Sequence, residues 1–559
     1  MTAAASAPSW VQPRTLTLPQ PSLLGAQPGF THEQAKAAHA VLNDNHDQFN
    51  VFFNLSGFHN HLAHHVLAAL ALSAPPSHYQ RADTHARSVW LDPAFKLNHK
   101  PVQGDGIERI TRGNWTAHLL ELSYYWSYLA FFEDEIAQHG VPATLEHFLF
   151  DEQHALASPA HMLLRLFGGA LHPLIHIGYG LEFGIDGIVA EGLAMAAITE
   201  ARETDLFPEG WYAKAHCHTP SEQKKGTKVT PSTPRSGLSL FTIFAQMGAD
   251  PALAPGTAAQ WSDASKFASV LKSCGTRIAR YLEHWHTTPE DVQGPEESAW
   301  GAKVDELIWI NTLLLGATSR PHYPTPTPSG SAKGEPPLQH NFFLMHTHNA
   351  TLFLPSYLRS AALSPRARAL LLHGLARSTA YYWIATGRPD FFVAERLYDP
   401  RSLERAYRPE HQGSDANSTE RAAALMDRAE EKGVIDSRSS PWYDLLPAAS
   451  LHMDEHLVKA IRAQAYFASR LGHTAPGSLH LQEEDVLDGG GSKGEGKEER
   501  VWKGQLGLVD GSAFVRTAGQ MMESQTWAAS GLEADMKWTQ QAIGFDEAWV
   551  PKGDEHKHK

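Results

Sequence analysis

The chain has almost no cysteine, and the two residues present, Cys217 and Cys274, stand in a sequence of 559 residues. Two thiols cannot build a disulfide framework or a four-thiolate zinc site, which favours an intracellular protein. No apolar run approaches the roughly 20 residues that a membrane span requires. The first 28 residues contain five prolines and no apolar stretch typical of a signal peptide. These absences predict a cytoplasmic protein with no membrane partner. A weak transit peptide stays open as an alternative, because no acidic residue precedes Glu33.

Positive charge is also scarce. Lys and Arg number 47 against 61 Asp and Glu, for a formal net charge of −14. The lysines that cluster, Lys224, Lys225 and Lys228, lie in a polar segment bounded by prolines. A phosphate backbone is bound by a basic patch, and this chain has none. We therefore expect no nucleic-acid partner.

Alternating strand patterns are almost missing, whereas helical periodicity is frequent. The glycine-rich stretch 178–184 has the wrong spacing for a dinucleotide loop and follows no strand pattern. The chain therefore predicts an all-α fold without a Rossmann sheet. Helices are expected over 61–72, 115–136, 173–198, 261–284, 304–315, 342–358, 367–386, 418–432 and 452–471.

Three polar segments, 218–237, 321–338 and 483–500, interrupt the helical pattern. Their composition cannot bury enough apolar surface to order the chain, so we expect disordered insert loops. No block between them looks self-sufficient. We predict a single large multi-helical domain over residues 29–550, preceded by a flexible tail at 1–28 and followed by a polar tail at 551–559.

Histidine is the residue that the chain has in excess, with 33 in total. The densest cluster contains His61 and His65, and a second string contains His172 and His176. Residues four apart in a helix share a face, so each pair can direct two imidazoles to one place. Neutral imidazole is a common ligand of mid-row metals. Each of these histidines can equally be a cap or a packed core residue, and that alternative stays open.

Two later strings add further candidates. His346 follows the apolar run 342–345 and is expected to point inward, while His348 lies on a different helix face. The string His452-Met-Asp-Glu455-His456 formally matches the H-x-x-E-H zinc-protease variant. His456 lies deeper in the expected helix than His452 and is the better inward candidate. A solvated helix start is the alternative for this string.

Aromatic residues gather in the stretch 124–132 and recur at Tyr179. Tyr125, Trp126 and Tyr179 are candidates to line a slot for a flat aromatic ligand. An aromatic-rich core helix is the alternative interpretation.

The chain resembles the questin oxidase-like family at four strings, which are His-Asn-His-Leu-Ala-His-His (59–65), 172–183, Phe-Phe-Leu-Met-His (342–346) and Asp-Glu-His-Leu-Val-Lys (454–459). This family comprises fungal secondary-metabolism oxygenases implicated in oxidative opening of anthraquinone-type rings. The resemblance implies an all-helical oxidoreductase acting on aromatic polyketides. By matching position, the metal-site candidates that it implies are His61, His172, His346 and His456, with His65 and His176 as their partners four residues on.

One departure from the family pattern concerns a lysine that the resemblance leads us to expect in the helix after the third string. The stretch 372–377 contains none. If that lysine contributes to a metal site, this chain must either replace it, with His373 as the nearest candidate, or lack full activity.

Ring opening by dioxygen needs either a flavin or a redox metal with an open coordination position, and no flavin or nicotinamide fingerprint is present. We therefore hypothesise a mononuclear non-haem iron site with one histidine from each of four helices. NADPH is a candidate reducing co-substrate. Two alternatives stay open, a metal-dependent hydrolase with Glu455 or Glu182 as base, and a non-catalytic helical binding protein whose histidines do not converge.

Overall fold

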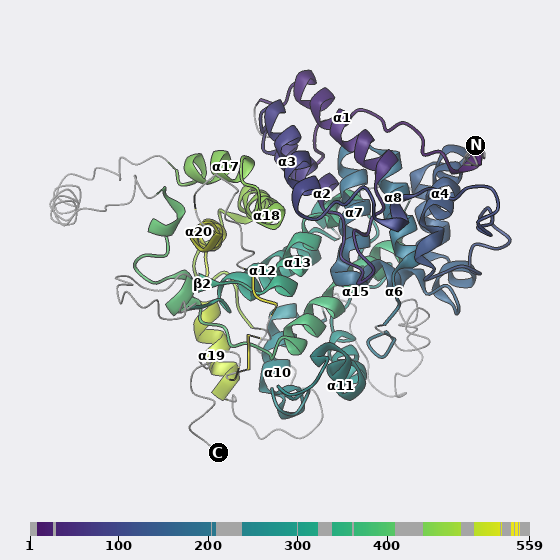
Figure 1. Cartoon of the computed structure of the whole chain (residues 1–559). Helices are drawn as coiled ribbons and strands as arrows, with labels where there is room; N and C mark the ends of the chain where they lie inside the picture. Colours follow the sequence, from purple (N-terminus) through teal and green to yellow (C-terminus); the bar gives the residue numbers. More distant parts are fainter. Residues whose placement is uncertain are drawn as a thin grey trace, which may run out of the picture.

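The structure is a computed structural model in which helices predominate (Figure 1). It describes residues 8–25, 29–202, 204–207, 237–298, 300–321, 338–359, 363–408, 440–481, 497–525, 527, 538–540, 543–545 and 547. Within these ranges the only sheet is the antiparallel pair β1 (Arg320–Pro321) and β2 (Leu338–Gln339), with Arg320 opposite Gln339. The expected all-α fold without a Rossmann sheet is confirmed.

The helices of the first half of the chain pack as two neighbouring groups. In Figure 1, α1, α2 and α3 lie together, and α4, α7 and α8 lie beside them. The long helices are α1 (His32–Gln48), α2 (Leu62–Ala71), α3 (Pro76–Val89), α4 (Tyr125–His139), α7 (His172–Phe183) and α8 (Asp186–Ile198). The short ones are α5 (Val141–Leu145) and α6 (Met162–Phe167).

The second half supplies the central helices and the opposite side of the molecule (Figure 1). Its helices are α10 (Leu240–Ala249), α11 (Lys266–Leu282), α12 (Gly301–Gly316), α13 (Phe342–Thr351), α14 (Leu354–Leu358), α15 (Pro365–Ala385), α17 (Trp442–Ser450), α18 (Glu455–Leu471), α19 (Lys497–Leu506) and α20 (Ala513–Gln525). Helices α2, α7, α13 and α18 form a closed ring of contacts, in which α2 packs on α7 and α18, and α13 packs on the same two helices. This ring positions the site.

Three of the expected helices begin or end elsewhere for local reasons. Helix α4 begins at Tyr125 and not at Trp115, because Leu120 has a positive φ of 73° that no helix can contain. The expected helix 173–198 is two helices, separated at Gly184, whose φ of 64° suits a glycine at a helix end. The expected helix 342–358 is likewise α13 and α14, and Pro355 in the first turn of α14 has no N–H to continue α13.

Helix α18 begins at Glu455 because Asp454 caps it. The Asp454 carboxylate accepts hydrogen bonds from the backbone N–H groups of His456 and Leu457, both at 2.9 Å. His452 therefore lies before the helix, and the expected helix start at 452 is wrong. The H-x-x-E-H string does not place its two histidines on one helix face, as a zinc-protease motif requires.

The terminal tail and the insert segments differ in part from expectation. Residues 8–25 are not a free tail, because Val11 and Leu16 are buried and the Leu16 N–H donates to Asn43 Oδ1 at 2.9 Å. Helix α19 begins at Lys497, inside the segment 483–500. The rest of that segment, most of 218–237 and 321–338, the expected helix 418–432 and the tail 551–559 lie outside the described residues.

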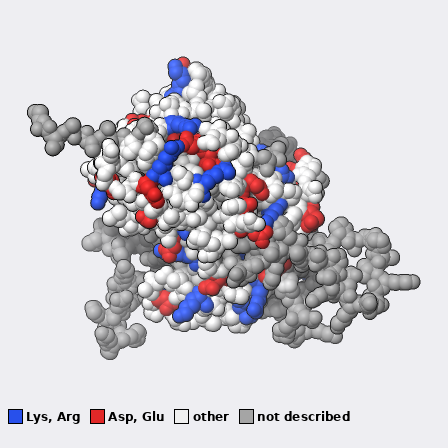
Figure 2. Space-filling model, turned by 90° about the vertical axis from the view of Figure 1, so that its right-hand side faces the viewer, with Lys and Arg blue, Asp and Glu red and all other residues white. Residues whose placement is uncertain are grey.

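The surface carries charges of both signs. Acidic and basic side chains are interspersed on the face shown in Figure 2, and Asp134 bridges Arg14 and Arg109. Of the helices that the structure describes, none combines the length and apolar content needed to cross a bilayer.

Candidate functional site

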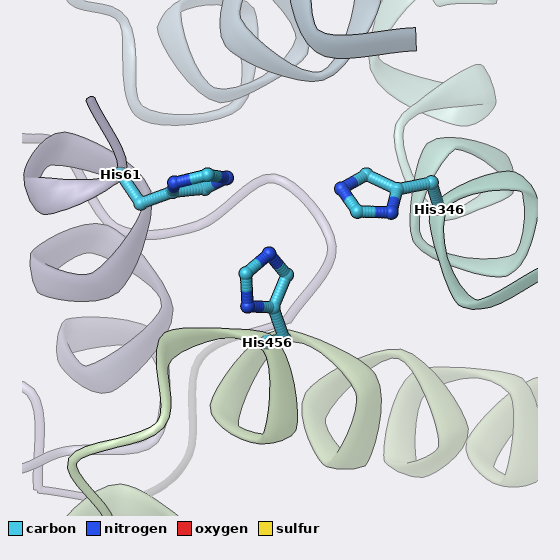
Figure 3. A group of neighbouring side chains, drawn as sticks. All are labelled: His61, His346 and His456. Carbon is cyan, nitrogen blue, oxygen red and sulfur yellow. The ribbon is translucent and has the colours of Figure 1, made fainter. Parts of the chain in front are cut away.

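Three histidines from distant parts of the chain converge in the ring of helices (Figure 3). His61 is the residue before α2, His346 lies in α13 and His456 lies in the first turn of α18. One ring nitrogen of each lies within 4.8 Å of the others, and all three side chains are buried. This convergence is the arrangement expected from the sequence.

His172, the first residue of α7, completes the group. Its Nε2 atom lies 2.8 Å from Nε2 of His61, and its ring centre is 4.7 Å from that of His346. Its Nδ1–H donates to the Gly169 carbonyl at 2.5 Å, which leaves the Nε2 lone pair directed at His61. At this distance the two nitrogens either form an N–H···N hydrogen bond, in which His61 Nε2–H donates to His172 Nε2, or bind one cation between them.

The protonation of these rings favours a cation. Burial, followed by repulsion from Lys459 and neighbouring histidines, lowers the pKa of His61 and His456 well below the ordinary value. Burial lowers the pKa of His346 to about 3. Each ring is therefore neutral near pH 7 and offers a lone pair, which is the form that binds a metal.

The hydrogen bonds leave nitrogens open toward the centre of the group. His346 Nδ1–H donates to the Phe342 carbonyl at 2.7 Å, and its Nε2 has no hydrogen-bond partner among the described residues. Neither ring nitrogen of His456 has one either, although Nδ1 lies 3.2 Å from Glu455 Oε1. Buried unsatisfied nitrogens are costly, so these residues fit a divalent cation. We name His61, His172, His346 and His456 the histidine cluster.

Lys459 lies one turn after His456 and is not among the site residues predicted from the sequence. It is buried, and its Nζ makes no hydrogen bond within the described part of the chain. Burial lowers its pKa to about 8, against the opposing effect of Glu455 and Asp454. The signal was present in the string 454–459, because a lysine on the inward face of an amphipathic helix is unusual.

His373, the expected replacement for a site lysine, lies elsewhere. Its Nδ1 accepts a hydrogen bond from Arg377 Nε at 3.0 Å, and its ring is 6.3 Å from that of Trp285. Lys459 is the lysine that the fold brings to the histidine cluster.

His65 and His176 are buried, but their ring nitrogens face other partners. His65 Nε2 donates to the His452 carbonyl at 3.1 Å. His176 Nε2–H donates to Glu191 Oε2 at 2.6 Å, and its Nδ1 accepts from His64 Nε2 at 3.0 Å. The structure therefore brings four of the six candidate histidines together. The rings of the other two, His65 and His176, form hydrogen bonds with residues outside this group.

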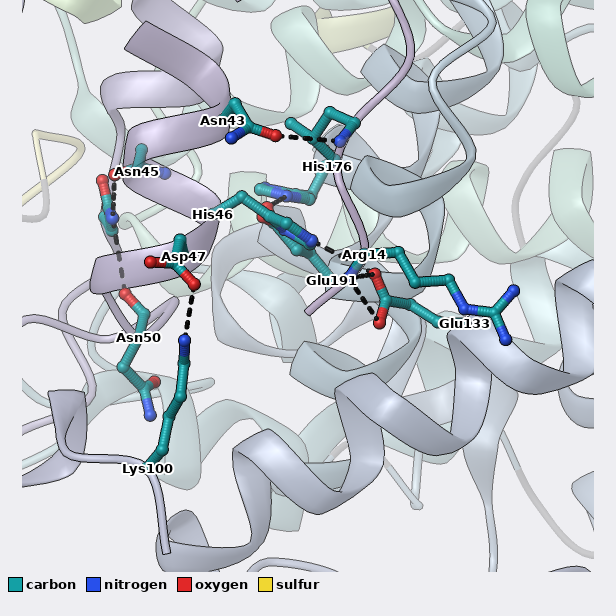
Figure 4. Close-up of polar contacts among 12 residues, drawn as sticks. Arg14, Asn43, Asn45, His46, Asp47, Asn50, Lys100, Glu133, His176 and Glu191 are labelled. Atoms are coloured by element: carbon teal, nitrogen blue, oxygen red, sulfur yellow. Dashed lines mark hydrogen bonds and ion pairs between the residues drawn. The ribbon is translucent and has the colours of Figure 1, made fainter. Parts of the chain in front are cut away.

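Behind His176 runs a buried chain of carboxylates and imidazoles (Figure 4). Glu191 also accepts from His46 Nδ1, and Nε2 of His46 lies 3.2 Å from Glu133 Oε1. Glu133 in turn accepts from the Arg14 backbone N–H at 3.0 Å. The sequence signal for this series of buried carboxylates and imidazoles was Glu191, whose carboxyl group stands inside the apolar stretch 188–197.

The buried chain has a defined charge state. Burial disfavours the His46 imidazolium, but hydrogen bonds with Glu133 and Glu191 outweigh it and raise the pKa of His46 to about 9. Burial opposes ionisation of Glu191 as well, yet hydrogen bonds from His176 and His46 lower its pKa to about 2. His46 is therefore a buried cation held between two carboxylates.

These two pKa values predict how this pair changes stability with pH. The raised pKa of His46 gives stabilisation that is complete below its ordinary value of 6.5 and lost as pH rises through about 9. The lowered pKa of Glu191 gives stabilisation present above its ordinary value of 4.5 and lost as pH falls toward 2. We expect the largest contribution of the pair between these ordinary values. Urea unfolding at pH 6 and pH 9 checks this, and a His46→Asn variant should lose less stability over that interval than the unmodified chain.

The aromatic candidates divide into two groups. Tyr179 stacks on His64 with ring centres 5.1 Å apart and therefore lies beside the histidine cluster. Trp126 donates through Nε1 to the Leu97 carbonyl at 3.0 Å, and Tyr125 is buried near Glu191. Both are core residues of α4. Phe342 was not a candidate, yet its ring lies 4.4 Å from that of His346 and 5.2 Å from that of His456.

The two acidic candidates also separate. Glu182 forms a buried ion pair with Arg462 and accepts from the Ser22 hydroxyl, so it is a structural residue. Glu455 Oε1 lies 3.8 Å from His61 Nδ1, and burial followed by repulsion from Asp454 raises its pKa to about 7. Of the two, Glu455 is positioned at the site.

Known proteins similar to this chain are named as oxidases or oxidoreductases. Questin oxidase of Aspergillus terreus is 26% identical over 520 residues, which cover 92% of each chain. Baeyer-Villiger oxidase ptaJ of Pestalotiopsis fici is 27% identical over 363 residues, covering 64% of this chain and 71% of the relative. Oxidoreductase AflY of Aspergillus parasiticus is 26% identical over 377 residues, covering 65% and 67%. The protein is thus an all-helical enzyme of the oxidase type.

Residues 58–464 match the family described as Questin oxidase-like, and this range contains the whole histidine cluster and Lys459. The chain belongs to the questin oxidase-like family. The resemblance seen in the sequence is confirmed.

Proposed function

We propose that this enzyme is an oxygenase that opens a ring of an aromatic polyketide, such as an anthraquinone, with dioxygen at a histidine-bound non-haem iron. The printed names of its relatives, questin oxidase and Baeyer-Villiger oxidase, support the reaction class. The observation that carries the proposal is the convergence of the neutral, buried imidazoles of His61, His346 and His456, with His172 in contact with His61.

His61, His172, His346 and His456 would hold the metal through their unprotonated nitrogens. Imidazole ligands suit both iron and zinc, and the oxidase relatives favour the redox-active metal. Iron, when bound, supplies the redox chemistry that dioxygen needs to react with an organic ring.

The chain's own residues contribute binding, charge and proton handling. Phe342 presents an aromatic ring to His346 and His456, a surface on which a flat substrate can stack. Among the described residues, the Lys459 ammonium has no counter-charge within hydrogen-bonding distance, and it therefore stabilises negative charge that develops on a substrate oxygen. Glu455, with a pKa of about 7, exchanges a proton at Oε1 near neutral pH.

A metal-dependent hydrolase is the second candidate function, and the raised pKa of Glu455 is the observation in its favour. A hydrolase would contain zinc, would use Glu455 as the base for a bound water and would consume no dioxygen. The names of the relatives, two oxidases and one oxidoreductase, argue against it.

Oxygen uptake tests the proposed function. Purified enzyme loaded with ferrous iron is incubated with hydroxylated anthraquinones, with and without NADPH, and dioxygen consumption and product mass are followed. We expect substrate-dependent uptake and a ring-opened product that carries oxygen from labelled dioxygen. A His346→Ala variant should show neither. Hydrolysis without uptake would support the hydrolase, and inertness toward every quinone would contradict the oxygenase.

A further inference from the structure

Within the histidine cluster, His61 is the residue most exposed to solvent. His172, His346, His456 and Lys459 are each at most 3% exposed. His61 is 8% exposed, and the side chain of the adjacent Glu455 is 17% exposed. The edge of the cluster that a molecule from solution can reach first is therefore the His61–Glu455 edge.

An aromatic contact chain leads from that edge to the surface. The His61 ring meets Trp90 edge-on at 6.5 Å, at the end of α3. Trp90 contacts Phe53 at 5.5 Å, and Phe53 contacts Phe58 at 6.0 Å. Phe58 is 48% exposed, so the chain of rings begins in solvent and ends at a candidate ligand.

The loop that carries Phe53 and Phe58 is held in shape. Phe52 and His59 form an isolated antiparallel bridge, and the Phe53 N–H donates to the Phe58 carbonyl at 3.0 Å. The Asn54 side chain accepts from the Phe58 N–H at 3.1 Å. At its far end the loop places His59 flat against His172, with ring centres 3.8 Å apart. The loop thus fixes an exposed apolar surface next to the site.

The exposed apolar surface extends beyond the rings. Leu55, at the tip of the loop, is 75% exposed, and Val89, beside Trp90, is 63% exposed. Exposed apolar side chains beside a chain of rings that reaches a buried site are a candidate ligand-binding surface. We call Phe53, Leu55, Phe58, Val89 and Trp90 the apolar rim.

We propose that the apolar rim captures a planar polycyclic aromatic substrate and passes it to the histidine cluster past Trp90. This proposal rests on the proposed function and specifies how the substrate is selected. Ring faces at Phe53, Phe58 and Trp90 bind a flat aromatic molecule by stacking, and Leu55 and Val89 cover its edges. Glu455, at the inner end, gives the mouth a polar group for a substrate hydroxyl. Small polar substrates gain nothing from such a mouth.

The test is a comparison of KM with kcat. Phe58→Ala should raise KM for an anthraquinone substrate about 10-fold, because one stacking partner is lost, and should leave kcat within about 2-fold. Phe58→Trp, which keeps a ring, should restore the original KM. Leu508→Ala is the matched control, since Leu508 is similarly exposed, at 44%, in another part of the fold. Iron content and unfolding midpoint are measured for each variant.

Other occupants of the rim give different results. If KM is unchanged in Phe58→Ala while concentration-dependent dimerisation of the unmodified chain is lost, the rim is a self-association surface and the proposal is overturned. Loss of binding to phosphatidylcholine vesicles with unchanged KM overturns it in the same way. Equal effects of Phe58→Ala and Leu508→Ala also overturn it. Failure of the proposed function is distinct, because the unmodified enzyme would then turn over no quinone, while binding of anthraquinone to the rim is still measurable by calorimetry.

Discussion

Replacing Lys459 with methionine is expected to lower kcat about 100-fold or more while the protein keeps its metal and becomes more stable. The ammonium is buried without a hydrogen-bond partner in the described structure, so the folded state bears a desolvation cost. Methionine fills a similar volume without an unsatisfied donor, which we expect to raise the free energy of unfolding by roughly 1–3 kcal/mol. Loss of a preorganised charge in a dry site typically costs about 100- to 1000-fold in rate.

Steady-state kinetics, iron content and urea unfolding measure the three effects. Lys100→Met is the control, because Lys100 is paired with Asp47 near the surface and lies over Trp126, away from the cluster. It should leave kcat and iron content unchanged. Unaltered kcat in Lys459→Met would remove the charge-stabilising role, and loss of iron in that variant would show that Lys459 organises the metal instead.

Replacing Glu191 with glutamine is expected to destabilise the protein by about 3–5 kcal/mol. Glu191 accepts from both His46 and His176 in the interior, and the His46 imidazolium depends on it for charge balance. A glutamine side chain has one acceptor oxygen and one NH2 donor group in place of two acceptor oxygens. One of the two imidazole N–H groups therefore faces a donor. The buried cation is left with Glu133 alone.

Urea unfolding at pH 6, where the ion pair is intact, measures this effect. Asp186→Asn on the same helix is the control, because Asp186 is exposed in the first turn of α8. It should cost less than about 1 kcal/mol. A second variant, His46→Asn combined with Glu191→Gln, removes the unbalanced cation and should recover part of the lost stability. Equal stability of Glu191→Gln and the unmodified chain would contradict the buried ion pair.

The sequence was sufficient to identify the four histidines of the cluster, but it was not sufficient to predict how their rings contact one another. Each of His61, His172, His346 and His456 stands in a recognisable string, whereas the contacts among α2, α7, α13 and α18 depend on packing over long stretches of chain. The same limit explains why the sequence did not predict the contacts of His65 and His176. Each lies four residues after a histidine of the cluster, but this spacing does not determine which partner its ring contacts. Their rings bond to His452 and Glu191, partners far away or outside the motif.

Fold class was predictable because helical spacing persists through long segments, while helix ends depend on single residues. The left-handed backbone at Leu120 prevents the helix from beginning before that residue, and the leucine side chain gives no sequence signal for this conformation. The Asp454 cap, in contrast, was readable, since aspartate before an apolar helix is a common start signal. Residues 8–25 illustrate a third case, because their order comes from packing on α1 and α4 and not from local preference.

Metal analysis of purified protein tests the central claim most directly. The unmodified chain should carry about one iron per molecule. His346→Ala should lose it, and His348→Ala, which removes an equally buried imidazole from the same helix, should retain it. Folded protein without metal, or iron that survives in His346→Ala, would contradict a metal centre built on His61, His172, His346 and His456.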